Sequence, residues 1–323
     1  MANRKVNFAA VGRDLYLDLP LSQTVMDYRQ ENGIADLIAP VVNVSKQSGA
    51  IIEFSQGDKW RVVDDKRSPG TNAKRYTSDV SSQLYYCNNY ALMDGVTIED
   101  RNNADPVFAM REIEGKALRL TDKLMLNWEN RVSLQVTSTT NVGSSAAVSS
   151  IWSTTEGDGN PLVDLNTAID NVRYATGYRP NRMVFGAKAW DGFRRHKNVR
   201  NLIFGVNNGG GYANTAQVKE VFEMDSIEVA GMFKNTGEEN IANTIGAIWG
   251  PSVLVYYAPL TPSVEKPSFM YSYRLSAPGI PNMQVERHPY DSRAKADDIE
   301  VGYYQDELIT GKRFGFLVQS CAA

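Results

Sequence analysis

Histidine and cysteine, which often carry enzyme chemistry, are scarce in this sequence. Its two histidines are His196 and His288, and its two cysteines are Cys87 and Cys321. The cysteines are far apart and match no metal-binding or redox spacing. With so few histidines, a Ser/His/Asp triad, a Cys/His pair or a zinc site is disfavoured. Two cysteines do not make a disulfide framework either, which fits a reducing cytoplasm.

The other residues that could bind a metal or a phosphate lack the required spacing. The acidic pairs Asp64-Asp65 and Asp297-Asp298 do not follow the calcium-loop pattern, so we interpret them as solvated carboxylates. The glycine run Gly209–Gly211 lacks the spacing of a dinucleotide fingerprint, and we expect a flexible loop there. The sequence contains neither a nucleophile elbow nor a phosphate-binding P-loop. We therefore predict no catalytic residue, no cofactor and no metal, and a protein that is not an enzyme.

A dense mixture of charges lies in the polar stretch 56–82. A long excursion that carries both signs suits contact with other copies of the chain, so we predict ion pairs between subunits. The alternative is a hairpin whose charges are solvated. The predicted contact residues of this stretch are Lys59, Arg61, Asp64, Asp65, Lys66 and Arg67.

A second basic run, Arg194 to Lys197, lies at the expected end of a helix. Cations are favourable there because of the helix dipole. We predict a solvated or interface cap, with Arg194 and Arg195 as further contact candidates; nucleic-acid binding and catalysis are the alternatives. The formal charge of the chain is −3, from 34 basic and 37 acidic residues. Since a protein that grips phosphates is usually clearly basic, nucleic-acid binding is disfavoured as its main task.

The composition is that of a globular protein. The chain has 323 residues, of which 42% are hydrophobic and 22% charged, far from the composition of disordered chains. The N-terminal segment meets Arg13 and Asp14 before any long apolar run, so we expect no signal peptide. Glycines and prolines interrupt the uncharged stretch between Glu239 and Glu265, which predicts two buried strands rather than a membrane span.

The first half of the chain shows a projecting loop followed by a long helix. Strand-like runs at 41–55 and 83–99 flank the polar stretch 56–82, which predicts a long two-stranded loop. Apolar residues in steps of three and four predict a helix over 104–136, with Asp105 as its N-cap and a length of roughly 50 Å.

The remaining segments differ in character. Residues 1–40 show little periodicity beyond a short helix near Leu21–Gln30, so we interpret them as an arm. The Ser-, Thr- and Gly-rich stretch 137–160 predicts a boundary. Residues 161–265 alternate between helix and strand, and the segments after them are mostly strand-like.

This layout resembles the major capsid proteins of tailed bacteriophages, whose shell fold is also used by encapsulins. The strongest local match is Trp152 followed by residues 157–204, which is similar to lambda-like coat proteins. Its features are a helix that ends in Thr176-Gly177, then Pro180-Asn181, a strand, and a helix that carries Trp190. The resemblance implies an α+β, HK97-like capsid fold with an N-terminal arm, an extended β-loop, a long spine helix, a peripheral domain and an axial domain.

The resemblance also implies domain boundaries. It assigns residues 1–45 to the N-terminal arm, 46–99 to the extended loop and its flanking strands, 100–160 and 266–323 to the peripheral domain with the spine helix 104–136, and 161–265 to the axial domain.

The function implied by the resemblance is that of a virion capsid protein. Copies would assemble in the host cytoplasm as hexamers and pentamers of an icosahedral shell that encloses double-stranded DNA without sequence-specific binding. The expected partners are other copies, a portal protein, a separate scaffolding protein, because no scaffolding region precedes the arm, and optionally a decoration protein; no membrane is involved. The alternatives are an encapsulin-type compartment, a hydrolase or transferase with an unusual site, and a nucleic-acid-binding module around Arg194–Arg200.

Overall fold

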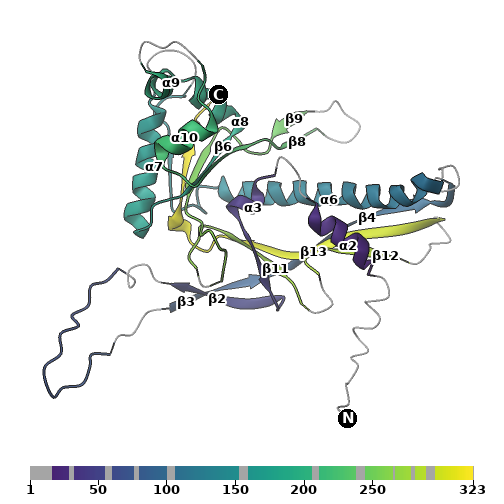
Figure 1. Ribbon diagram of the computed structural model, residues 1–323, viewed down its shortest axis with the longest axis horizontal. Coiled ribbons are helices and arrows are strands. Elements are labelled where there is room, and N and C mark those ends of the chain that lie inside the picture. Colours follow the sequence, from purple (N-terminus) through teal and green to yellow (C-terminus); the bar gives the residue numbers. More distant parts are fainter. Residues whose placement is uncertain are drawn as a thin grey trace.

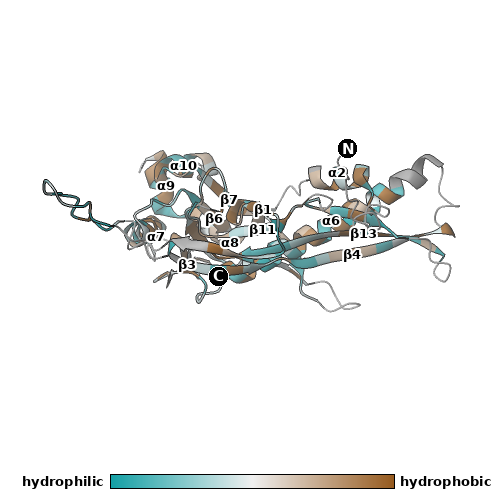
Figure 2. Cartoon of the chain, turned by 90° about the horizontal axis from the view of Figure 1, so that it is seen from below, coloured by the Kyte–Doolittle hydropathy of each residue, from teal (hydrophilic) through white to brown (hydrophobic). Residues whose placement is uncertain are grey.

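The molecule has an elongated body built around one long helix and one long strand (Figure 1). The computed structural model describes residues 17–28, 33–54, 60–75, 80–99, 106–152, 159–205, 211–237, 244–264, 266–277, 281–288 and 295–322. Helix α6 (Pro106–Val136) lies along strand β13 (Ala296–Leu308), and a second group of helices and strands sits at one end of this pair. The hydropathy view shows a hydrophilic loop that projects from the same end (Figure 2).

Helix α6 is the spine helix expected over 104–136. Its buried apolar residues are seven or four positions apart, a spacing that places them on one face of the helix; they are Ala117, Leu124, Trp128, Val132 and Val136. At 1.5 Å per residue its 31 residues span about 46 Å. The predicted N-cap, Asp105, lies outside the described residues.

The first sheet lies along α6 and is centred on β13. Strand β13 pairs with β4 along most of its length, from Ala296 opposite Thr97 to Gln305 opposite Asn88. Helix α2 packs on this sheet through Leu21 and Val25, which share a core with Val285. The sheet order is β1 (Val41–Val44), β11 (Tyr271–Leu275), β13 and β12 (Gln284–Arg287), and β4 (Asn88–Thr97) also pairs with β13. Of the helices before this sheet, α2 spans Leu19–Asp27 and α3 spans Ala35–Ile38.

The second sheet is buried on both faces at its centre. Along its central strand β10, Val253 and Val255 pack toward one core, whereas Leu254 and Tyr256 pack toward a core shared with the spine helix. A strand covered on both faces is expected to be a continuous apolar run, as this one is. The sheet order is β5 (Ser144–Ala147), β14 (Gly315–Gln319), β10 (Val253–Tyr256), β6 (Arg182–Gly186) and β7 (Ser226–Ala230).

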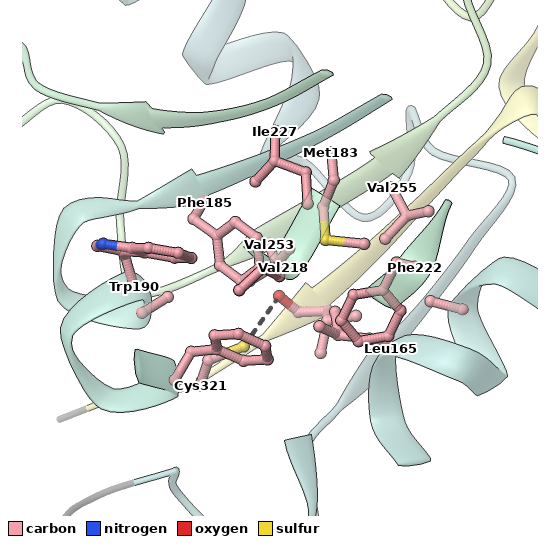
Figure 3. Packing of buried hydrophobic residues seen from close by; sticks show 14 of the residues in the cluster. Leu165, Met183, Phe185, Trp190, Val218, Phe222, Ile227, Val253, Val255 and Cys321 are labelled. Atoms are coloured by element: carbon pink, nitrogen blue, oxygen red, sulfur yellow. Dashed lines mark hydrogen bonds between the residues drawn. The ribbon is translucent and has the colours of Figure 1, made fainter. Parts of the chain in front are cut away.

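Four helices surround the outer core of the second sheet. Figure 3 shows Phe185 and Trp190 beside Leu165, Phe222 and Cys321 in this core. The ring centroids of Phe185, Trp190 and neighbouring Phe193 lie 5.2–5.9 Å apart, which is the range of favourable aromatic pairs. The helices are α7 (Pro161–Thr176), α8 (Ala187–Arg195), α9 (Lys197–Phe204) and α10 (Thr215–Phe222).

Helix α7 has a capped start and ends at the Thr176-Gly177 pair expected from the sequence. The Asn160 side chain accepts a hydrogen bond from the Leu162 amide, and Pro161 occupies the first turn. Gly177 ends the helix in the left-handed conformation, with φ of 73°.

Two hairpins extend from the body. In the first, β2 (Ser48–Phe54) pairs with β3 (Val80–Tyr86), from Ser48 opposite Tyr86 to Phe54 opposite Val80. The second consists of β8 (Phe233–Asn235) and β9 (Ile245–Ala247). The stretch Glu239–Glu265 therefore forms two strands, but β9 pairs with β8 and is only partly covered.

Three features of the fold were not expected. The Ser-rich stretch after α6 contains strand β5, which pairs in parallel with β14 and so adds an edge to the second sheet. The segment after α8 turns at His196 into the separate helix α9. A short 3-10 helix, η1 (Lys312–Phe314), leads into β14.

Candidate assembly surfaces

The projecting loop carries most of the predicted contact residues. Between β2 and β3, every described residue from 60 to 75 is exposed. Arg61 and the run Asp64–Arg67 lie together on this extended segment, as predicted, whereas Lys59 lies outside the described residues. The loop projects away from the body (Figure 1), and its residues are hydrophilic (Figure 2).

Asp64 and Arg67 make contacts within the loop itself. Asp64 forms an ion pair with Lys74 across the loop and also accepts a hydrogen bond from the Lys66 amide at 3.1 Å. The Lys74 ammonium and this amide hold the pKa of Asp64 below its usual value. Arg67 Nε donates to the Thr71 carbonyl at 2.5 Å and closes the tip. Exposed ion pairs such as this one stabilise a loop only weakly. The ion pairs between subunits stay a prediction.

Arg194 and Arg195 lie on a different part of the molecule, at the end of α8. Together with Arg200 they surround the ring of Tyr212, with guanidinium carbons 5.7–6.0 Å from its centroid. Arg194 also pairs with Asp191 at 2.8 Å. This arrangement forms a basic, partly aromatic corner, and Tyr212 was not identified from the sequence.

The two histidines have structural contacts. His196 is buried, and its Nδ1 accepts a hydrogen bond from the Asn198 amide at 3.2 Å. It therefore caps the start of α9 instead of lying solvated at the end of α8, because the chain turns between the two helices. Burial lowers the pKa of His196. His288 contacts Glu300 at 2.8 Å on the first sheet.

The structure exposes apolar residues that sequence analysis missed. On the hairpin β8–β9, Phe233 and Ile245 are 54% and 72% exposed. They lie on one face, because the partner of Phe233 is two positions from Ile245 and the partner of Ile245 is two positions from Phe233. Lys234 points the other way and donates to Asn130 of the spine helix at 2.9 Å. The hairpin thus rests on α6 and presents an apolar face outward.

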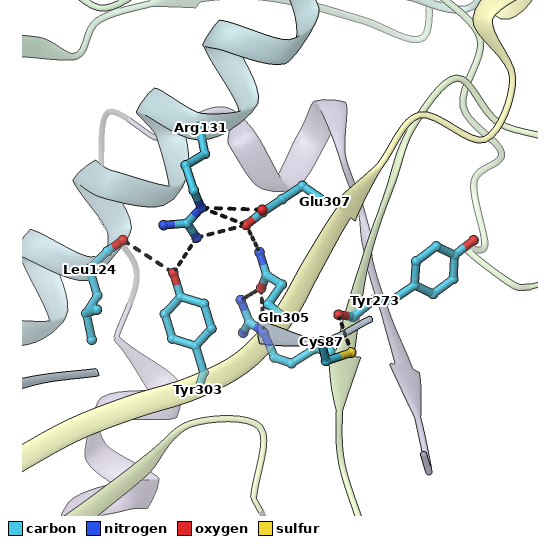
Figure 4. A network of polar contacts seen from close by, with 8 residues as sticks. Cys87, Leu124, Arg131, Tyr273, Tyr303, Gln305 and Glu307 are labelled. Atoms are coloured by element: carbon cyan, nitrogen blue, oxygen red, sulfur yellow. Dashed lines mark hydrogen bonds and ion pairs between the residues drawn. The ribbon is translucent and has the colours of Figure 1, made fainter. Parts of the chain in front are cut away.

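A buried polar network holds the spine helix to β13 (Figure 4). Arg131 donates to Glu307 at 2.8 Å and to the Tyr303 hydroxyl at 3.0 Å. Gln305 donates to the same carboxylate at 2.8 Å and accepts from Arg274. Since Glu307 is only 5% exposed, it depends on these donors to replace water. The network therefore joins the spine helix to the first sheet.

A second buried carboxylate attaches the arm to the spine helix. Glu129 Oε2 accepts hydrogen bonds from the amides of Ile34 and Ala35, at 3.1 and 2.7 Å. Its Oε1 accepts from Trp249 Nε1 at 2.5 Å. Burial raises the pKa of Glu129, although these three hydrogen bonds act in the opposite direction, and nearby Asp36 raises it further. One residue of α6 therefore joins α3 to the segment that precedes β10.

The described residues bring together no cluster of three or more histidine, cysteine, aspartate or glutamate side chains that could hold a metal ion. Both cysteines are buried and free, and burial raises the pKa of Cys87 to about 11 and that of Cys321 to about 12. Thiols in this state are poor nucleophiles. Within the same residues, no helix is long and apolar enough to cross a membrane.

Comparison with known proteins identifies relatives across nearly the whole chain. No protein-family model matches the sequence. The major capsid protein of Burkholderia phage BcepMu is 21% identical over 279 residues, which cover 84% of this chain and 87% of that protein. A crystal structure of a phage-related protein from Bordetella bronchiseptica RB50 is 24% identical with a TM-score of 0.74, covering 95% of this chain and 98% of the other.

Capsid structures share the same fold at lower identity. The capsid of cyanophage P-SCSP1u has a TM-score of 0.57 at 11% identity, over 98% of both chains. The SrpI encapsulin of Synechococcus elongatus PCC 7942 has a TM-score of 0.51 at 13% identity, over 95% of this chain and 96% of the other. The predicted α+β, HK97-like capsid fold is confirmed, as is the resemblance to phage major capsid proteins. The encapsulin alternative corresponds to a more distant match.

Proposed function

We propose that this chain is the major capsid protein of a tailed bacteriophage, and that its copies form the hexamers and pentamers of an icosahedral shell around double-stranded DNA. The observation that carries the proposal is the likeness to a phage major capsid protein over 84% of this chain and 87% of that relative. The role is structural rather than enzymatic, and the protein belongs to the capsid of the virion.

The exposed surfaces suit assembly from many weak contacts. The charged loop around Asp64, the apolar face of Phe233 and Ile245, and the basic corner around Tyr212 lie on three separate parts of the body. Contacts that are individually weak become effective when one subunit makes several of them at once. We assign Arg61, the run Asp64–Arg67, Arg194 and Arg195 to these contacts, with Lys59 as a further candidate.

The proposed domain division follows the expected boundaries with one refinement. Residues 1–45 serve as the arm, 46–99 as the extended loop and its strands, and 161–265 as the axial domain, while 100–160 and 266–323 supply the peripheral domain. Strands β5 and β14 pair beside β10, so these two segments of the peripheral assignment complete the axial sheet.

The proposed partners are other copies of the chain, a portal protein, a separate scaffolding protein and, optionally, a decoration protein. Assembly takes place in the host cytoplasm. DNA is enclosed without sequence-specific contacts, in keeping with the net charge of −3.

Electron microscopy of the purified protein, produced alone and together with its scaffolding protein, tests the proposal. We expect closed particles, tubes or capsomer rings, and particles that hold DNA in infected cells. Particles that hold an enzyme cargo would favour the encapsulin alternative. A protein that stays monomeric in every condition would contradict the proposal.

Charge reversal in the loop tests the assigned contacts. The double variant Lys66→Glu/Arg67→Glu should fold normally, because both side chains are exposed, but should form at least about tenfold fewer particles if ion pairs between subunits are lost. Glu114→Lys on the exposed side of α6 is the matched control. Equal particle yields for the loop variant and the control would remove the loop charges from the contacts.

A further inference from the structure

The base of the projecting loop touches the axial end of the same chain. Trp60, the first described residue of the loop, donates a hydrogen bond from its indole Nε1 to the Thr176 carbonyl at 2.9 Å. That carbonyl belongs to the last turn of α7, where no further helical amide is available to it. The two residues are 116 positions apart, so the contact joins separate parts of the fold.

The end of α7 has a shape that only glycine allows beside this indole. A β-carbon on Gly177 would lie 2.6 Å from Trp60 Cε2 and 2.7 Å from Nε1, far inside van der Waals contact. Gly177 also has φ of 73°, a conformation that other residues adopt with strain. The same glycine thus ends the helix and makes room for the tryptophan.

Aromatic rings of the body pack against the Trp60 indole and against one another. Trp60 meets Tyr178 edge to face, with ring centroids 5.9 Å apart. Tyr178 in turn contacts Tyr257 at 5.0 Å and Phe314 at 5.7 Å, and Phe314 is buried. The receiving surface is therefore part of the packed body. Trp60 itself stays 55% exposed, which makes the contact a modest and reversible one.

We propose that Trp60 is a positioning residue that sets the direction in which the projecting loop leaves the subunit. The hairpin β2–β3 holds the loop at one place, and the seated indole of Trp60 holds it at a second. A loop that is attached to the body at two places has a defined direction, whereas a loop attached at one place can rotate about that point. The consequence for a shell rests on the proposed function: the loop is aimed by its own subunit before any neighbour binds it.

Limited trypsin digestion of the unassembled chain tests the contact. Arg61 follows the seated tryptophan, so cleavage after it requires release of the indole, whereas Arg67 is exposed further along the loop and needs none. Intact-mass spectrometry gives the initial rate at each site. Gly177→Ala leaves the loop sequence unchanged but expels the indole, and should raise cleavage after Arg61 about tenfold with no change after Arg67, because the rate follows the released population.

Control variants separate this role from general damage to the fold. Gly205→Ala also introduces a side chain at positive φ, 82°, but with nothing within 4 Å, and should leave the ratio of the two cleavage rates unchanged. Trp60→Phe keeps a ring and loses the indole N–H, so an intermediate ratio is expected after correction with peptides of each loop sequence. In a Trp60→Ala background, Gly177→Ala should add no further change, since both act through one contact.

Three results would overturn the proposal: equal rates at the two sites in the unchanged protein, the same ratio for Gly177→Ala, or an equal effect of Gly205→Ala. If Gly177→Ala does not fold, the Trp60→Phe and Trp60→Ala digests decide alone. Electron microscopy of assembled Trp60→Ala should show loops without a single direction and fewer closed particles. The digestion needs no shell, so a failure of assembly and the absence of the Trp60 contact give distinguishable results.

Discussion

Replacing Glu129 by glutamine is expected to weaken the attachment of the arm to the spine helix. The carboxylate is 1% exposed and accepts three hydrogen bonds, two from the amides of Ile34 and Ala35 and one from Trp249. An amide keeps only one oxygen. If that oxygen accepts from the two backbone amides, the side-chain NH2 of the glutamine faces the indole N–H of Trp249. Both groups are donors, so the hydrogen bond to Trp249 is lost.

The expected loss follows from this geometry. A buried donor without an acceptor costs about 1–3 kcal/mol. At higher pH, where Glu129 is ionised, the substitution also removes a buried charge, and this offsets part of that cost. We expect Glu129→Gln to lower the free energy of unfolding by about 1–2 kcal/mol at acidic pH, where the carboxyl is neutral.

The effect should depend on pH with a definite sign. Burial raises the pKa of Glu129 in the folded protein above its value of 4.5 in the unfolded chain. The folded state then binds the proton more strongly, so the stability contributed by Glu129 is fully present below pH 4.5 and is lost as pH rises through the raised pKa. Glutamine does not titrate. The stability difference between the two proteins should therefore be largest at acidic pH and shrink as pH rises.

Denaturant unfolding of both proteins at about pH 5 and about pH 8 measures this difference. Glu114→Gln, at an exposed position of the same helix, is the control and should change stability by less than about 0.5 kcal/mol. A difference that grows with pH would refute the reasoning, since it would mean that the three hydrogen bonds outweigh burial and depress the pKa.

Two further predictions concern the interior. Arg131→Ala should lower the free energy of unfolding by about 3–5 kcal/mol, because it leaves Glu307 buried and short of a donor. The double variant Arg131→Met/Glu307→Leu should recover most of this loss. Thermal unfolding measures both, and a mild effect of Arg131→Ala would contradict the prediction. A thiol-specific reagent at about pH 8 should not modify the native protein but should modify both cysteines in denaturant, because burial raises the pKa of Cys87 to about 11 and that of Cys321 to about 12. Rapid labelling of the native protein would show that either thiol is accessible.

Elements with local causes were predictable from the sequence. The steps of three and four that mark the spine helix and the end of α7 at Gly177 each depend on neighbours within a turn. The charged loop was predictable because a long polar run between two strand-like runs has no core of its own. His196 lies at a helix end, as expected, but its burial and its cap on α9 were not predicted, because they depend on the chain turn that separates α8 from α9.

The sequence by itself thus determined the kind of elements, their order and the resemblance to capsid proteins, because helix periodicity and caps act over a few residues. Only the tertiary structure decided which distant residues meet. Glu129 receives amides 94 and 95 residues away, and Trp60 reaches a carbonyl 116 residues away. Strand β5 is fully exposed and Ser-rich, so its pairing with β14 leaves no apolar pattern to detect. Such contacts depend on backbone groups and on the shape left by glycine, and neither has a periodic signal in the sequence.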